Sequence, residues 1–141
     1  MKQRDKGWLE GIIDGDGCLG VYKRNTPHTR AGISFQPRLM IVNTDRRILE
    51  RAQMILGGVG NIYQRHKEIG NRKFLYLYQV SGHVLLNFLP KLVLTGKDEQ
   101  RKLVIEACHL ISEHRTRHTP HMTRLGEICL EFRRLNKKGR F

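Results

Sequence analysis

The chain has 141 residues, and its 26 lysines and arginines outnumber its 13 aspartates and glutamates, which gives a net charge of +13. We expect a single domain over residues 1–141, and the basic excess predicts an anionic partner, nucleic acid before a membrane surface. No apolar stretch reaches the ~18 residues that a membrane span requires, and Met1–Gly7 lacks the apolar core of a signal peptide, so we expect a cytoplasmic protein.

The first predicted element is a helix over residues 7–16 in which glycine recurs at every fourth position. Gly7, Gly11 and Gly15 therefore lie along one face, although each costs about 1 kcal/mol against alanine inside a helix. A row of small residues lets two helix backbones approach closely, and such packing would compensate for that cost.

The same helix ends in an Asp-Gly-Asp-Gly sequence, residues 14–17. Carboxylates at the negative end of a helix dipole need a cation or a hydrogen-bond donor beside them. A divalent metal is the strongest such partner, and oxygen ligands suit magnesium. The alternative is a buried helix that is closed by an ordinary Asp-Gly turn.

Two pairs of strands with alternating polar and apolar residues are predicted after this helix. The first pair covers residues 18–24 and 33–42, and the second covers residues 61–67 and 72–80. A helix between the pairs begins at the Asn-Thr-Asp sequence of residues 43–45.

Helices are predicted for the rest of the chain, over residues 84–94, 97–112 and 123–135. Pro90 is expected to kink or split the first of them, because proline removes a helical hydrogen bond. A basic tail, residues 133–141, follows and is expected to be frayed.

This order of elements predicts an α+β fold, with helices gathered on one face of a four-stranded antiparallel sheet. The opposite face is then bare and rich in arginine, glutamine and tyrosine. Strands that read the major groove need this mixture, arginine for guanine and glutamine for adenine, whereas a plain solvated face is the alternative. We assign DNA contact to Tyr22, Arg24, Ser34, Gln36, Arg38, Asn61, Tyr63, Arg65, Arg72 and Tyr76.

Residues 9–17 resemble the signature of the LAGLIDADG homing endonucleases, and the main departure is Glu10 where the family has alanine. The order of elements also resembles the family's αββαββα core over residues 5–112, which C-terminal helices and the basic tail follow over residues 113–141. The resemblance implies a saddle-shaped sheet with DNA on its open face. The signature matches at Leu9, Gly11, Ile13, Asp14, Asp16 and Gly17.

Members of this family with one motif per chain act as homodimers, and this chain has one motif. The resemblance therefore implies a dimer that forms through the motif helix, with Asp16 and the backbone carbonyl of Gly15 as metal ligands. It also implies a catalytic Lys97 near the scissile phosphate, with Asn43 and Arg46 where the family has a water-ordering polar residue and an arginine. The implied dimer interface comprises Gly7, Trp8, Gly11, Ile12 and Gly15.

The function implied is that of a homing endonuclease, an Mg²⁺-dependent enzyme that makes a double-strand break in a long pseudo-palindromic DNA site. Other divalent cations would substitute for Mg²⁺. Two alternatives stay open, a non-cleaving binder of the same fold (an RNA maturase or a DNA-binding module) and a general basic RNA-binding protein.

A zinc site is the weakest candidate in the sequence. His114 and His118 have a ligand spacing, but no cysteine pair accompanies them. We expect Cys108 and Cys129 to lie in the core, and the odd number of cysteines argues against a disulfide framework.

Overall fold

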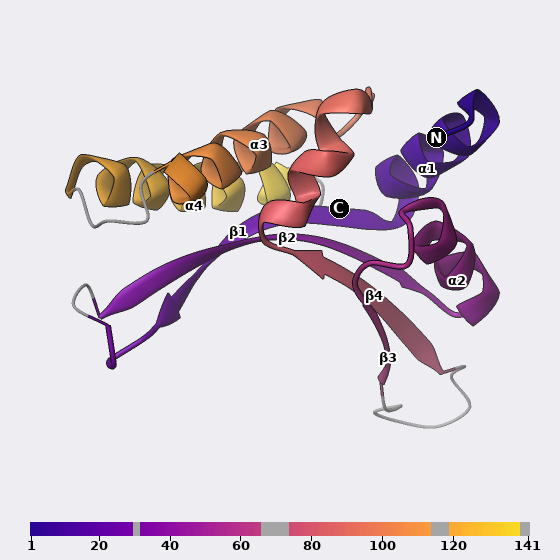
Figure 1. Ribbon diagram of the computed structural model, residues 1–141, viewed down its shortest axis with the longest axis horizontal. Coiled ribbons are helices and arrows are strands. Elements are labelled where there is room, and N and C mark those ends of the chain that lie inside the picture. Colours follow the sequence, from indigo (N-terminus) through magenta and orange to yellow (C-terminus); the bar gives the residue numbers. More distant parts are fainter. Residues whose placement is uncertain (30–31, 66–73, 114–118, 139–141) are drawn as a thin grey trace.

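The computed structural model describes residues 1–29, 32–65, 74–113 and 119–138. A helix precedes each pair of strands and helices follow the second pair, as the sequence predicts, and the long helices flank the sheet on one side (Figure 1). The elements are α1 (Gln3–Asp16), β1 (Gly17–Asn25), β2 (Ile33–Asn43), α2 (Arg46–Ile55), β3 (Asn61–Arg65), β4 (Leu75–Ser81), the 3₁₀ helices η1 (His83–Asn87) and η2 (Leu89–Lys91), α3 (Asp98–Glu113) and α4 (Thr119–Lys138).

The four strands form one antiparallel sheet in the order β1-β2-β4-β3. Figure 1 shows the β1–β2 hairpin and the β3–β4 pair bending away from the helices at the two ends of the sheet, so that the uncovered face is concave. Sheets twist with a fixed hand, which produces this saddle shape in an open four-stranded sheet. The α+β architecture predicted from the sequence is confirmed.

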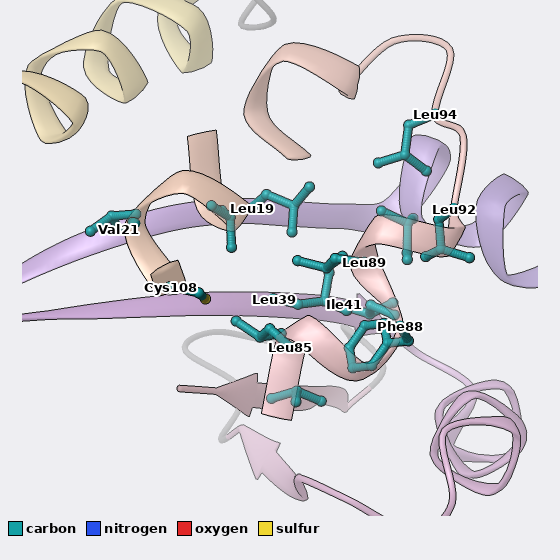
Figure 2. Close-up of a cluster of buried hydrophobic side chains, with 14 of the residues drawn as sticks. Leu19, Val21, Leu39, Ile41, Leu85, Phe88, Leu89, Leu92, Leu94 and Cys108 are labelled. Atoms are coloured by element: carbon teal, nitrogen blue, oxygen red, sulfur yellow. The ribbon is translucent and has the colours of Figure 1, made fainter. Parts of the chain in front are cut away.

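The core lies between the sheet and the helices, and strand alternation determines which residues enter it. Leu19 and Val21 of β1 and Leu39 and Ile41 of β2 are buried on the same face. Figure 2 shows them facing side chains from the 3₁₀ segment and from α3. The helices and the segment between β4 and α3 contribute Leu9, Ile13, Leu49, Leu85, Phe88, Leu89, Leu92, Leu94, Val104, Ala107, Cys108, Leu125, Ile128 and Phe132.

The turn after α2 is shaped by the close approach of β4. Gly60 has a φ of 81°, and a Cβ there would lie 2.6 Å from the carbonyl oxygen of Gln79, so only glycine fits. The buried Tyr78 donates its hydroxyl to the carbonyl oxygen of Val59 at 2.5 Å. This bond gives the hydroxyl of the buried Tyr78 a hydrogen-bond partner.

Two of the predicted elements differ in the structure. Residues 84–94 form two short 3₁₀ helices and an extended segment instead of one α-helix, because Pro90 has no N–H and stands at the start of η2. The basic residues 133–138, expected to be frayed, continue α4, where Arg134 forms an i,i+3 ion pair with Glu131. In the described part of the chain, no helix combines the length and the apolar character needed to cross a membrane.

Candidate active site and nucleic-acid interface

The end of α1 and the end of β2 meet at the second acidic residue of the motif. Asp16 is the last residue of α1 and is exposed. Asn43, at the end of β2, donates from Nδ2 to Asp16 Oδ2 at 3.0 Å. Oδ1 of Asn43 accepts from the backbone N–H of Asp45 at 2.8 Å, and this second bond determines the orientation of the side-chain amide. The structure thus brings together Asp16 and Asn43, which the sequence interpretation placed in one site.

Lys97 lies at the same helix end, but its ammonium group is occupied. Nζ donates to the carbonyl oxygens of Ile13 at 3.1 Å, Asp14 at 2.9 Å and Gly17 at 2.5 Å. Ile13 and Asp14 belong to the last turn of α1, at the negative end of its dipole, and Gly17 is the residue that follows the helix. The Ile13 carbonyl also accepts from the backbone N–H of Gly17. Lys97 therefore caps α1 in this structure, and its predicted contact with a scissile phosphate stays a prediction.

Two carboxylates of α1 hold the segment that leads to Lys97. Asp14 accepts from the backbone N–H groups of Thr95 at 2.8 Å and Gly96 at 3.0 Å. One turn earlier, Glu10 accepts from the backbone N–H of Val93 at 2.6 Å and forms an ion pair with Lys6 at 3.4 Å. The residue that departs from the family signature thus extends the same set of backbone contacts.

The importance of Glu10 was missed in the sequence interpretation. Its position one helical turn before Asp14 was the available signal, because residues four apart lie on the same helix face.

The glycine row of α1 has no packing role inside this subunit. Gly7, Gly11 and Gly15 are exposed, and a Cβ at any of them would meet no atom of the described structure within 4 Å. The other two predicted interface residues, Trp8 and Ile12, pack in part against the subunit's own core. The cost of about 1 kcal/mol for each glycine is therefore uncompensated in the isolated subunit.

The open face of the sheet carries most of the residues predicted to contact DNA. Because alternate residues point to opposite faces, the buried Leu19, Leu39 and Val80 identify the residues of the open face as their immediate neighbours in each strand. This face includes Tyr22, Arg24, Ser34, Gln36, Arg38, Asn61, Tyr63 and Arg65. Arg72 lies outside the described residues.

The prediction that Tyr76 lies on the open face is wrong. Tyr76 pairs with Asn43 in the β2–β4 register, two residues from the pair of Ile41 and Tyr78, so it faces the helices. It packs against the core there, with the guanidinium of Arg46 5.8 Å from its ring. Leucine and tyrosine alternate in β4, so composition did not reveal which face was buried. Residues on the open face that the sequence interpretation missed include Cys18, Gly20, Met40, Val42, Leu75, Leu77, Gln79 and Ser81.

Arg46 begins α2 and is paired within that helix. Its Nε donates to Glu50 Oε1 at 2.9 Å, an i,i+4 ion pair at the surface. Together with the stacking on Tyr76, this contact directs Arg46 along α2. Its predicted catalytic role stays a prediction.

An ordered set of polar side chains occupies the middle of the open face. The guanidinium of Arg38 lies 4.7 Å from the ring centroid of Tyr22, and Arg38 Nε donates to Gln36 Oε1 at 2.7 Å. Gln36 Nε2 donates in turn to Ser81 Oγ at 3.3 Å. Burial is the main cause that raises the pKa of Tyr22 to about 12, with Cys18 adding to it, so the phenol stays protonated at neutral pH.

Metal ligands within one subunit are few. Among the described residues, no three of the histidine, cysteine, aspartate and glutamate side chains converge on a point where a metal ion could bind.

The two cysteines of the C-terminal helices contact the core, as expected. The buried Cys108 is a core residue, and burial raises the pKa of its thiol to about 11. Cys129 packs partly against the core and donates to the carbonyl oxygen of Val21 at 3.2 Å. His114 and His118 of the zinc hypothesis lie outside the described residues.

The fold and this site define a class: an α+β subunit with one motif helix, whose acidic end lies beside a concave sheet. The family model of the LAGLIDADG endonucleases matches residues 9–108. The chain belongs to the LAGLIDADG endonuclease family, in its single-motif form.

Solved structures with this fold include several homing endonucleases. The chain is similar to the archaeal intron-encoded homing endonuclease I-Vdi141I complexed with DNA, with a TM-score of 0.80 and 22% identity over 99% of this chain and 89% of that chain. It is similar to I-CvuI bound to the I-CreI target with magnesium, in which the DNA is not cleaved (TM-score 0.75, 22% identity, 94% and 82% of the two chains). It is also similar to I-TnaI (TM-score 0.75, 18% identity, 96% and 97%). At these identities the likeness shows the fold. No match was found among curated protein sequences.

Proposed function

We propose that this protein is a homing endonuclease that works as a homodimer and cuts both strands of a long pseudo-palindromic DNA site. The observation that carries the proposal is the row of exposed glycines on α1, which ends at the exposed Asp16. A twofold-symmetric contact between two such helices gives the glycines a packing role and brings two copies of Asp16 to one place. Within the described part of one subunit, no packing contact accounts for the row.

Asp16 and the carbonyl of Gly15 are the proposed metal ligands. Both are oxygen donors, and the carbonyl belongs to the last turn of α1, where helical partners are lacking. Oxygen ligands of this kind suit Mg²⁺, with Ca²⁺ or other divalent ions as substitutes. A divalent ion bound there would polarise the scissile phosphate and lower the pKa of a bound water.

The remaining residues of the site orient the carboxylate and attract the phosphate. Asn43 holds Oδ2 of Asp16 and so determines which way the carboxylate faces. Lys97 places a positive charge at the end of α1. Arg46, three residues after Asn43, would add a second charge if DNA binding released it from its ion pair with Glu50. Fixed positive charges at this point favour an anionic phosphate and the charge that develops on it during hydrolysis.

The concave open face is the proposed DNA-binding surface. It carries arginine, tyrosine and amide side chains on strands that curve in one direction, as in Figure 1. The net charge of +13 supports an electrostatic attraction to the phosphate backbone. Relatives with this fold that were solved in complex with DNA also support the proposal.

The test is incubation of the purified protein with a duplex in which the two DNA sequences that flank the protein's gene element are joined without that element, once with Mg²⁺ and once with EDTA. We expect double-strand cleavage with Mg²⁺ alone, and Asp16→Asn should abolish cleavage while it leaves specific binding within about threefold, a difference below 1 kcal/mol. Asp5→Asn is the matched control, because Asp5 lies at the opposite end of α1. Specific binding by the wild type without cleavage would instead favour a DNA-binding module. Normal cleavage by Asp16→Asn would refute the metal assignment.

A further inference from the structure

Arg38 occupies the centre of the open face, and its surroundings restrict its direction. In the register it pairs with Gly20 of β1 and with Ser81 of β4, so strands flank it on both sides. The ring of Tyr22 covers Gly20 so closely that a Cβ on Gly20 would lie 3.0 Å from it. The guanidinium of Arg38 stacks on this ring at 4.7 Å. Because Gly20 has no side chain, the ring of Tyr22 can lie directly over the backbone of Gly20 and beneath the guanidinium of Arg38.

The hydrogen bonds of Arg38 leave one edge of its guanidinium available. Nε is used by Gln36, and the two terminal nitrogens have no acceptor among the described residues. A guanidinium is planar, so fixing Nε and the stacking plane also fixes the direction of the remaining N–H pair. That pair matches the O6 and N7 acceptors of guanine in the major groove.

Both polar atoms of the Gln36 side chain take part in this arrangement. Its Oε1 accepts from Arg38, and its Nε2 donates to Ser81. A glutamine that reads adenine needs both of these atoms for the base. The structure thus favours a positioning role for Gln36 over base reading.

We propose that Arg38 reads a guanine at one position in each half-site, and that Tyr22 and Gln36 are positioning residues that aim it. The inference rests on the proposed function, because it requires DNA on the open face. By contrast, Arg24 and Arg65 stand at strand ends, are exposed and have no hydrogen-bond or ion-pair partner among the described residues, which suits phosphate contacts.

The register also predicts where this guanine lies. Arg38 pairs with Gly20, which lies three residues along β1 from Gly17, the residue that directly follows α1. At ~3.3 Å per residue this separation is about 10 Å, which corresponds to about three base pairs if the strands follow the groove. The base should therefore lie about three pairs outward from the phosphate next to Asp16.

The experiment is selection of bound sites from a randomised duplex library by the full-length protein in Ca²⁺. The wild type should select guanine at one position per half-site, and Arg38→Ala should reduce that preference about 5- to 150-fold. Arg38→Lys should reduce it too, since an ammonium lacks the bidentate edge. Gln36→Ala should weaken the preference at the same position, whereas Gln36→Glu keeps the acceptor and should retain it. Gln79→Ala, an open-face glutamine of β4 that does not contact Arg38, is the matched control and should leave that position unchanged.

Three results would overturn the inference while the proposed function stands. Arg38→Ala could weaken binding evenly for all sequences, which would identify a phosphate contact. Gln36→Ala could relax a different position, which would show that Gln36 reads its own base. The wild type could also bind specific sites with no guanine that depends on Arg38. If the wild type selects no duplex at all, the proposed function fails and the inference fails with it. Thermal melts of each variant separate these effects from loss of folding.

Discussion

Replacing Gly11 by alanine should have opposite effects on the subunit and on its dimer. In the isolated subunit, a Cβ on Gly11 would meet nothing within 4 Å, so the change costs no packing. Removing a helical glycine should then stabilise the folded subunit by about 1 kcal/mol. In a dimer that forms through α1, the same Cβ falls where the two helix backbones are closest. Overpacking of this kind costs about 1–3 kcal/mol for each added Cβ. A twofold-symmetric dimer contains two such atoms, one from each subunit, so the total cost is doubled.

The net expectation is a dimer that dissociates at least about 30-fold more readily, because 2 kcal/mol corresponds to that factor. The assay combines sedimentation equilibrium for the dissociation constant with urea unfolding at a concentration where the variant is monomeric. Gly126→Ala is the matched control, since Gly126 is a helical glycine of α4 whose added Cβ would also meet nothing within 4 Å. It should gain the same helix stability and leave the dissociation constant unchanged.

The reasoning would be refuted if Gly11→Ala stabilised the subunit and dimerised as the wild type does. The glycine row would then have no role in association, and the proposed meeting of two Asp16 residues would lose its basis. A dissociation constant raised equally by Gly126→Ala would point to a general effect of helix stability instead.

Three further predictions concern single side chains. Glu10→Ala should lower the free energy of unfolding by about 1 kcal/mol, because it removes the partly exposed hydrogen bond between the Glu10 carboxylate and the backbone N–H of Val93. This bond holds the segment that leads to Lys97, so DNA cleavage should fall more than DNA binding. Equal losses of cleavage and binding would argue against a positioning role for Glu10. Arg124 lowers the pKa of Glu106 mainly through its hydrogen bond, so this pair stabilises the fold above the ordinary pKa of 4.5 and the contribution is lost as pH falls through the lowered value. Thermal melts between pH 5 and 3 should therefore fall less steeply for Glu106→Gln, and an unchanged slope would contradict this. Tyr76→Ala should cost about 2 kcal/mol of stability because Tyr76 packs on the core, whereas the exposed Tyr63→Ala should weaken DNA binding with little change in the melting temperature.

Much of the fold could be predicted from local patterns. The alternation in residues 18–24 and 33–42 is a property of strands with one buried face, and the structure pairs residues 17–25 with residues 33–41. The start signal at residues 43–45 also lies where α2 begins, with Asp45 accepting from the backbone N–H of Arg47. Prediction failed where two patterns were equally possible. In β4 both faces are apolar, and only pairing with β2 decides that Tyr76 and Tyr78 share the buried side.

The sequence by itself determined the motif helix, its glycine row, the acidic residues at its end and the order of strands and helices, because each depends on neighbours within a few positions. Only the tertiary structure decided how distant groups use one another. Lys97 caps α1 from more than eighty residues away, and Glu10 binds the backbone of Val93. Gln36 holds Arg38, which stacks on Tyr22 of the adjoining strand. Such contacts depend on register and on the approach of separate elements, and these are set by packing of the whole core.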